Sequence, residues 1–171
     1  IMKNVFSIRL LLIIAVILFA SQQVRAQAFD GADDHRLSAG YSQIGSLSGV
    51  ELGYEEGFND YFSWGMQVTA LFTGEKPDED GKFLDAYDIS FRLNFHWSEV
   101  FKLPSKFDVY TGISAGLKTV GLGCGARYHF SEHFGVYAAA HYAPFSTFTL
   151  GGSRIYYKGK PALSVGLTIG W

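Results

Sequence analysis

The sequence predicts an all-β chain, folded as an antiparallel up-and-down barrel of about eight strands. Apolar and polar residues alternate along repeated segments of roughly ten residues, which is typical of strands with two different faces. Aromatic residues make up 16% of the chain, and 20 residues are glycine. Helical periodicity is nearly absent after the N-terminal region, so the fold is expected to consist of strands and turns.

The N-terminal region predicts a cleaved signal peptide over residues 1–26. Two basic residues precede an apolar run over Leu10–Ala20, and small residues follow at Ala26 and Ala28. A basic start, a short apolar run and a small-residue exit are typical of exported chains. The run is shorter than the roughly 20 residues that a membrane-spanning helix needs. We therefore expect cleavage after Ala26 or Ala28, and a single barrel domain over residues 27–171.

Charge and cysteine content narrow the possible partners. Removal of residues 1–26 takes away three of the 14 basic residues and none of the 16 acidic ones, which leaves a net charge of −5. A net negative domain lacks the basic footprint of nucleic-acid-binding proteins, so no nucleic acid partner is expected. The single cysteine, Cys124, excludes an intramolecular disulfide.

Four segments in the first half of the chain predict strands, over residues 36–44, 49–58, 61–72 and 86–97. Each has about the length of a tilted membrane-crossing strand, roughly 9–11 residues. Their apolar faces consist, segment by segment, of Leu37, Ala39 and Tyr41; Val50, Leu52, Tyr54 and Phe58; Phe62, Trp64, Met66, Val68, Ala70 and Phe72; and Tyr87, Ile89, Phe91, Leu93, Phe95 and Trp97.

Four further segments predict the remaining strands, over residues 107–118, 120–130, 134–142 and 163–171. Their apolar faces consist of Phe107, Val109, Ile113, Ala115 and Leu117; Val120, Leu122, Cys124, Ala126, Tyr128 and Phe130; Phe134, Val136, Ala138, Ala140 and Tyr142; and Leu163, Val165, Leu167, Ile169 and Trp171. The chain thus ends on an aromatic residue that completes the last alternating segment.

The glycine pair at 151–152 predicts the register of the last hairpin. A two-residue turn there pairs Ala140 with Leu163 and Phe134 with Ile169. Apolar residues then face apolar residues along the whole hairpin, which supports this register.

A second two-residue turn is predicted at Lys118–Thr119. It pairs Leu117 with Val120 and Phe107 with Phe130, and again joins apolar to apolar positions.

The composition of the polar face decides which face points outward. It is rich in glycine and serine, which suit a crowded interior and make a poor solvated surface. Its charged residues are balanced in sign, as buried charges must be. We expect them to form an interior ionic network that consists of Arg36, Glu51, Glu55, Asp88, Arg92, Asp108, Lys118 and Arg127. The apolar face then points to lipid, and the aromatic residues at both strand ends form the two girdles of a membrane barrel.

These features resemble the small outer-membrane β-barrel proteins of Gram-negative bacteria, of the OmpA/OmpX type without a periplasmic domain. The resemblance is carried by the signal peptide, the strand pattern, the stretch "GLGCGARYHFSEHFGVYAAAHY" and the terminal "GLTIGW". It implies an eight-stranded barrel in the cell outer membrane with both mature termini in the periplasm. It also implies that the last strand is the signal for the outer-membrane assembly machinery, here formed by Val165, Leu167, Ile169 and Trp171. Phenylalanine is the usual last residue of that signal.

Function does not follow from such a fold, because its members differ widely in role. We favour a structural or surface-interaction role with a plugged interior, in contact with outer-membrane lipids and lipopolysaccharide. A small porin-like channel and a lipid-modifying enzyme are the alternatives. The Thr147–Lys160 hairpin, aromatic and basic, is interpreted as a girdle near lipopolysaccharide phosphates, with a contact to another protein as the alternative.

Catalytic and metal-site signals are weak, so neither an enzyme nor a cofactor is predicted. The spacing of His96 and Ser98 is similar to that in the lipid A deacylase family, but Glu99 stands where that family has asparagine. His141 and Ser146 lie five residues apart, and this spacing alone is a weak indication of a catalytic pair. The acidic loop over residues 74–82 resembles part of a calcium loop, although a lysine occupies the position of the first ligand.

Overall fold

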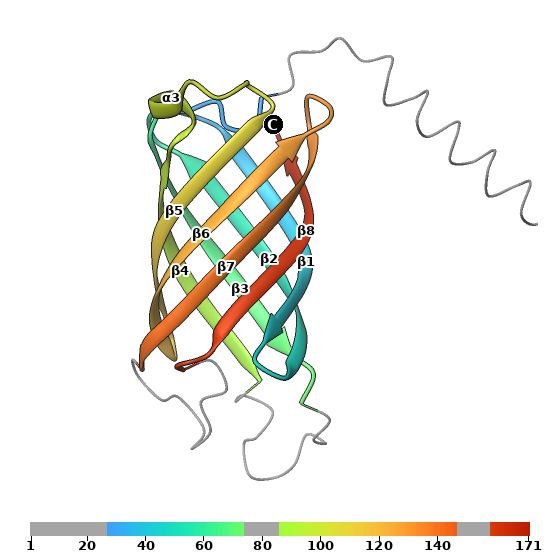
Figure 1. Cartoon of the computed structure of the whole chain (residues 1–171), viewed down its shortest axis with the longest axis vertical. Helices are drawn as coiled ribbons and strands as arrows, with labels where there is room; N and C mark the ends of the chain where they lie inside the picture. The colour runs from blue at the N-terminus through green and yellow to red at the C-terminus, as the bar shows by residue number, and fades with distance from the viewer. Residues whose placement is uncertain (1–26, 74–85, 147–157) are drawn as a thin grey trace, which may run out of the picture.

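Eight antiparallel strands form one closed ring in a computed structural model of the chain, which describes residues 27–73, 86–146 and 158–171 (Figure 1). The strands are β1 (His35–Ile44), β2 (Leu47–Gly57), β3 (Phe62–Leu71), β4 (Tyr87–His96), β5 (Phe107–Gly116), β6 (Thr119–His129), β7 (Phe134–Ser146) and β8 (Pro161–Gly170). Each strand pairs with its neighbours in sequence, and β1 pairs with β8 to close the ring. The predicted eight-stranded up-and-down barrel is confirmed.

The barrel wall carries its apolar side chains outside and its polar side chains inside. On β8, Val165 and Leu167 are 56% and 61% exposed, whereas Ser164 and Thr168 on the opposite face are 8% and 1% exposed. An apolar belt of this kind around the whole wall is unfavourable in water and favourable in lipid. The predicted assignment of the two faces is therefore confirmed.

One end of the barrel carries the β2–β3, β4–β5 and β6–β7 connections, a short helix and the C terminus (Figure 1). The helix, α3 (Ser98–Phe101), lies in the connection between β4 and β5. We call this end the α3 end, and the first described residues, 27–34, lie at it as well (Figure 1). Over the described part of the chain, no helix has the length and hydropathy that a membrane span requires.

The predicted register of the last hairpin is confirmed. Ala140 pairs with Leu163, and Phe134 pairs with Ile169. The glycine turn itself lies outside the described residues, as does most of the Thr147–Lys160 hairpin.

The predicted register between β5 and β6 is wrong by two residues. The turn consists of Leu117 and Lys118 rather than Lys118–Thr119, and Phe107 pairs with Tyr128 instead of Phe130. In the observed register the Lys118 backbone N–H donates to the carboxylate of Asp88 on the neighbouring strand (3.3 Å). A shift of two residues keeps every side chain on its face, so alternation alone cannot detect it.

A continuous band of aromatic rings surrounds part of the α3 end on the outside. Ring centroids lie 5.8 Å apart between Phe58 and Phe62, 5.1 Å between Phe62 and Phe95, 4.7 Å between Phe95 and Trp97, and 5.5 Å between Trp97 and Phe101. Aromatic rings concentrate at membrane–water interfaces. The band therefore corresponds to one of the two girdles expected from the sequence.

Candidate functional site in the barrel lumen

The barrel lumen is lined by polar side chains, and it contains all eight residues expected to form an interior network. Six of them are buried, namely Arg36, Glu51, Asp88, Asp108, Lys118 and Arg127. Glu55 and Arg92 are partly buried and line one cavity together with Arg36, Glu51 and Arg127. Glycine and serine on the same inward faces leave the space that these long side chains occupy.

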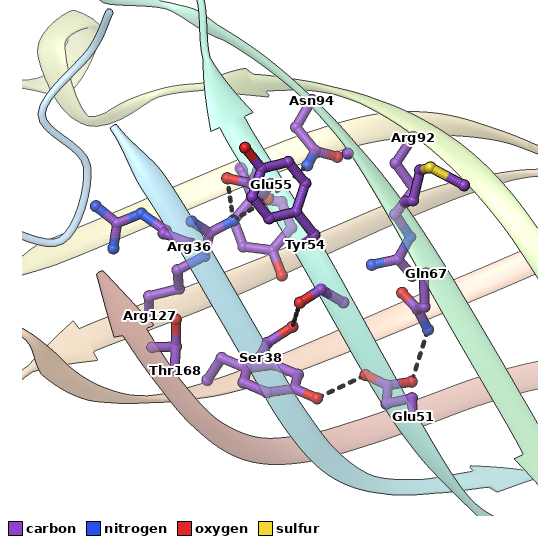
Figure 2. Close-up of a pocket in the computed structure, with 15 residues that line it drawn as sticks. Arg36, Ser38, Glu51, Tyr54, Glu55, Gln67, Arg92, Asn94, Arg127 and Thr168 are labelled. Atoms are coloured by element: carbon purple, nitrogen blue, oxygen red, sulfur yellow. Dashed lines mark hydrogen bonds and ion pairs between the residues drawn. The ribbon is translucent and has the colours of Figure 1, made fainter. Parts of the chain in front are cut away.

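An ion pair crosses the centre of the lumen. Arg127 Nη2 donates to both carboxylate oxygens of Glu55, at 2.7 and 2.6 Å, as Figure 2 shows. Asn94 donates to the same carboxylate at 3.0 Å, and the Arg127 guanidinium lies 4.4 Å from the centre of the Tyr110 ring. Because β2 and β6 are four strands apart in a ring of eight, the pair joins opposite walls.

A second set of hydrogen bonds in the lumen surrounds Glu51. The Tyr137 hydroxyl donates to one Glu51 oxygen at 2.7 Å, and Gln67 Nε2 donates to the other at 2.8 Å (Figure 2). Glu51, Gln67 and Arg92 line two cavities of the lumen. Each of these two cavities has a volume of about 40 Å³, which is room for a few water molecules.

Tyr110 and Tyr137 belong to the lumen and were missed by the sequence reasoning. Both are buried, at 6% and 8% exposure, on faces that otherwise carry small or charged residues. The feature that could have identified them as luminal is their cross-strand partner. Tyr110 lies opposite Gly125, and Tyr137 lies opposite Gly166. A large ring beside a glycine across the ladder fills the space that the glycine leaves.

Three residues at the α3 end have the hydrogen-bond order of a Ser-His-Asp triad. His96 Nδ1 donates to Asp108 Oδ2 (2.9 Å), and His96 Nε2 lies 2.8 Å from Ser63 Oγ. We call these residues the Ser63–His96–Asp108 cluster. All three side chains are 0% exposed. A substrate therefore cannot reach the Ser63 hydroxyl in this structure, even though His96 is placed to accept its proton. The arrangement supports a structural role, since it satisfies a histidine and a carboxylate that are both buried.

The two weak spacings noted in the sequence, His96 with Ser98 and His141 with Ser146, do not correspond to the contacts that these histidines make. Ser98 Oγ donates to Asp108 Oδ1 at 2.7 Å, so it contacts the partner of His96 rather than His96 itself. The observed partner of His141 Nε2 is Ser114 Oγ, at 2.6 Å. The Ser146 side chain lies outside the described residues.

No metal centre is present among the residues that the structure describes. No group of three or more His, Cys, Asp or Glu side chains is arranged there to hold an ion. The acidic loop that was compared with a calcium loop lies outside the described residues.

The residues of the expected C-terminal signal face outward. Val165, Leu167, Ile169 and Trp171 are 56%, 61%, 42% and 57% exposed. The Trp171 ring stacks on His35 with 5.9 Å between centroids, and the Trp171 N–H donates to the His35 carbonyl at 3.0 Å. The last residue is thus fastened to the first strand.

Solved structures share this fold. The N-terminal β-barrel domain of Pseudomonas aeruginosa OprF is 14% identical, with 83% of this chain and 100% of that chain covered and a TM-score of 0.51. Neisserial surface protein A is also 14% identical, with 81% and 96% covered and a TM-score of 0.51. The outer membrane protein OprG from Pseudomonas aeruginosa is 11% identical, with 87% and 99% covered and a TM-score of 0.50. At these identities the likeness extends to the fold alone, which is the OmpA/OmpX-type barrel that the sequence predicts.

Sequence comparison places the chain in a family. A comparison with curated proteins gives no match. Residues 19–159 match the profile of DUF6646, described as a family of unknown function. Since this match extends over most of the chain, the protein belongs to the DUF6646 family.

Proposed function

We propose that this protein is an integral outer-membrane barrel with a structural or surface-interaction role, whose lumen is closed to ions and solutes by its own side chains. The observation that carries the proposal is the Arg127–Glu55 pair, which joins opposite walls of the ring. Eight-stranded barrels have interiors that side chains just fill. A path along the barrel axis would have to break this pair and then the hydrogen bonds around Glu51.

The α3 end is assigned to the periplasm. Outer-membrane barrels have short periplasmic turns and longer extracellular loops. The two longest connections, over residues 72–86 and 147–160, join strands at the end opposite α3, where the other two connections are two-residue turns. The connections at the α3 end have at most ten residues. Both mature termini then lie in the periplasm. The opposite end meets lipopolysaccharide, and a protein contact at the Thr147–Lys160 hairpin stays a prediction.

A catalytic role is not part of the proposal. The triad-like cluster is sealed inside the wall, and its His96 ring is covered by Phe29 with ring centroids 3.5 Å apart. The outer wall presents apolar side chains, which supports contact with lipids.

Planar bilayer recording tests the closed lumen. The refolded protein is expected to give no sustained conductance steps, because the buried ion pair would have to separate in a low-dielectric interior before ions could pass. Heat-modifiable gel mobility of the same sample shows that the barrel is folded, and protein-free bilayers give the background. Sustained, ion-selective steps would contradict the proposal and favour the porin-like alternative.

Replacement of Trp171 by alanine is expected to lower the amount of folded barrel in the outer membrane severalfold. The ring anchors β8 to His35 at the seam where the ring of strands closes, and the assembly machinery is proposed to read the last strand. Trp171→Phe should restore the amount of folded barrel, measured in membrane fractions by heat-modifiable mobility. Phe134→Ala is the matched control, since it removes a 50% exposed girdle ring from β7. Equal losses in the two alanine variants would show a girdle effect instead of a C-terminal signal.

A further inference from the structure

Residues 27–34 cross the mouth of the lumen at the α3 end. The Ala28 N–H donates to the Ser105 carbonyl (2.7 Å), next to the start of β5. Asp33 N–H donates to the Gly57 carbonyl (3.1 Å), and Gly57 N–H donates to the Asp34 carbonyl (2.9 Å), at the end of β2. Because β2 and β5 are three strands apart, the segment is fastened to two well-separated parts of the rim.

The first apolar residues of the segment are inserted into the barrel. Ala28 is 0% exposed and Phe29 is 9% exposed, although both precede the first strand. The Phe29 ring stacks on His96 with an interplanar angle of 4° and 3.5 Å between ring centroids. Apolar side chains of a segment that simply trailed from the barrel would remain in water. Here they cover the Ser63–His96–Asp108 cluster from the solvent side.

Charge and close backbone packing hold the other half of the segment. Asp34 accepts hydrogen bonds from two nitrogens of Arg36, and its carboxylate also accepts the Asp30 N–H at 3.0 Å. The backbone at Gly31 packs so closely on Gly57 that a Cβ at Gly57 would lie 1.9 Å from the Gly31 carbonyl oxygen. The last strand residue of β2 is therefore suited to receive this segment.

We infer that residues 27–34 form a plug that seals the periplasmic mouth of the lumen and keeps water and solutes from the Ser63–His96–Asp108 cluster. This inference rests on the closed lumen proposed above, and it names the element that closes one end. The Phe29 ring is the part of the plug that covers the Ser63–His96–Asp108 cluster, whereas the buried Asp34–Arg36 pair and the backbone hydrogen bonds fasten the segment to the rim.

Thiol accessibility tests the plug in the full-length chain. Ser63→Cys is introduced in a Cys124→Ala background, and its reaction with a small, positively charged thiosulfonate is followed in refolded barrels. Phe29→Ala is expected to raise the reaction rate about tenfold or more, because the mouth then opens without global unfolding. Ser42→Cys is the matched control, since Ser42 is 2% exposed on an inward face but is near the opposite end. Its rate should not change with Phe29→Ala.

The outcomes separate the plug from the closed lumen. Equal reaction rates of Ser63→Cys with and without the Phe29 ring would overturn the plug. An increase in the reaction rates of both the Ser63→Cys and the Ser42→Cys thiols on loss of the ring would overturn it as well. Fast reaction of both cysteines in the presence of Phe29 would instead overturn the closed lumen. Hydrogen exchange of the backbone amides of residues 28–34 gives a second measurement that needs no substitution at Phe29. Slow exchange is expected, and exchange at the rate of an unstructured peptide would overturn the plug.

Discussion

Replacement of Arg127 by alanine is expected to lower the free energy of unfolding of the barrel by about 3–5 kcal/mol. The side chain is buried at 5% exposure and holds Glu55 through two short hydrogen bonds. Its Nε also lies 3.9 Å from the Asp108 carboxylate. The alanine variant leaves both carboxylates without this guanidinium in a lumen that holds few water molecules. Urea unfolding in lipid vesicles, followed by tryptophan fluorescence, measures the loss.

Two further variants separate the lost pairing from the lost volume. Arg92→Ala removes another luminal arginine, one that makes no hydrogen bond or ion pair with any described residue, and it should cost clearly less. The double variant Glu55→Gln, Arg127→Met removes both charges and should recover much of the stability. If Arg92→Ala and Arg127→Ala cost the same, the ion pair is not what stabilises the lumen.

Alanine at Gly166 is expected to cost about 1–3 kcal/mol, through overpacking at the seam where the ring closes. Gly166 pairs with Gly40 of β1 on one side and with Tyr137 of β7 on the other. A Cβ there would lie 2.2 Å from the Ala39 carbonyl oxygen and 2.7 Å from Tyr137 Cε1. The first of these atoms belongs to the backbone, so β1 and β8 must shift apart. The same unfolding measurement detects the loss.

Gly170 provides the control on the same strand and the same face. A Cβ at Gly170 would lie 3.6 Å from His129 Cε1 and 3.7 Å from the nearest atoms of Arg36, which is ordinary contact. Gly170→Ala should therefore be neutral or slightly stabilising, because alanine restricts the unfolded chain more than glycine does. Similar losses at Gly166 and Gly170 would show that the cost comes from replacing any glycine on this face of β8 and not from the close backbone approach at Gly166.

The sequence was sufficient to predict the strands, their faces and the closed barrel, because alternation with period two is a direct consequence of strand geometry. It was insufficient for the β5–β6 register, since a shift of two residues leaves the pattern unchanged. One contact of the observed register, the bond from Lys118 N–H to Asp88, joins residues 30 apart in sequence. Periodicity within one hairpin contains no information about such a contact.

The lumen was predicted as a set of residue types and not as a set of contacts. The balance of charge indicated which side chains face inward, but not that Arg127 would meet Glu55 or that His96 would contact Ser63. These pairs depend on which strands face each other across the ring. The role of residues 27–34 was not predicted for another reason, because this segment precedes the first alternating stretch and has no strand or helix period.

The β1–β8 pairing has a consequence for the order of folding. Every other pairing of the described strands is between neighbours in sequence, so it forms by closing a short stretch of chain. Only the β1–β8 pairing must bring together residues from the two ends of the domain, such as Arg36 and Gly170. The pairing of β1 with β8 therefore has the largest entropic cost of loop closure and the largest sequence separation among the strand pairings. That pairing cannot occur until the last strand has been synthesised and exported, so a chain that lacks its final residues is left with two open edges.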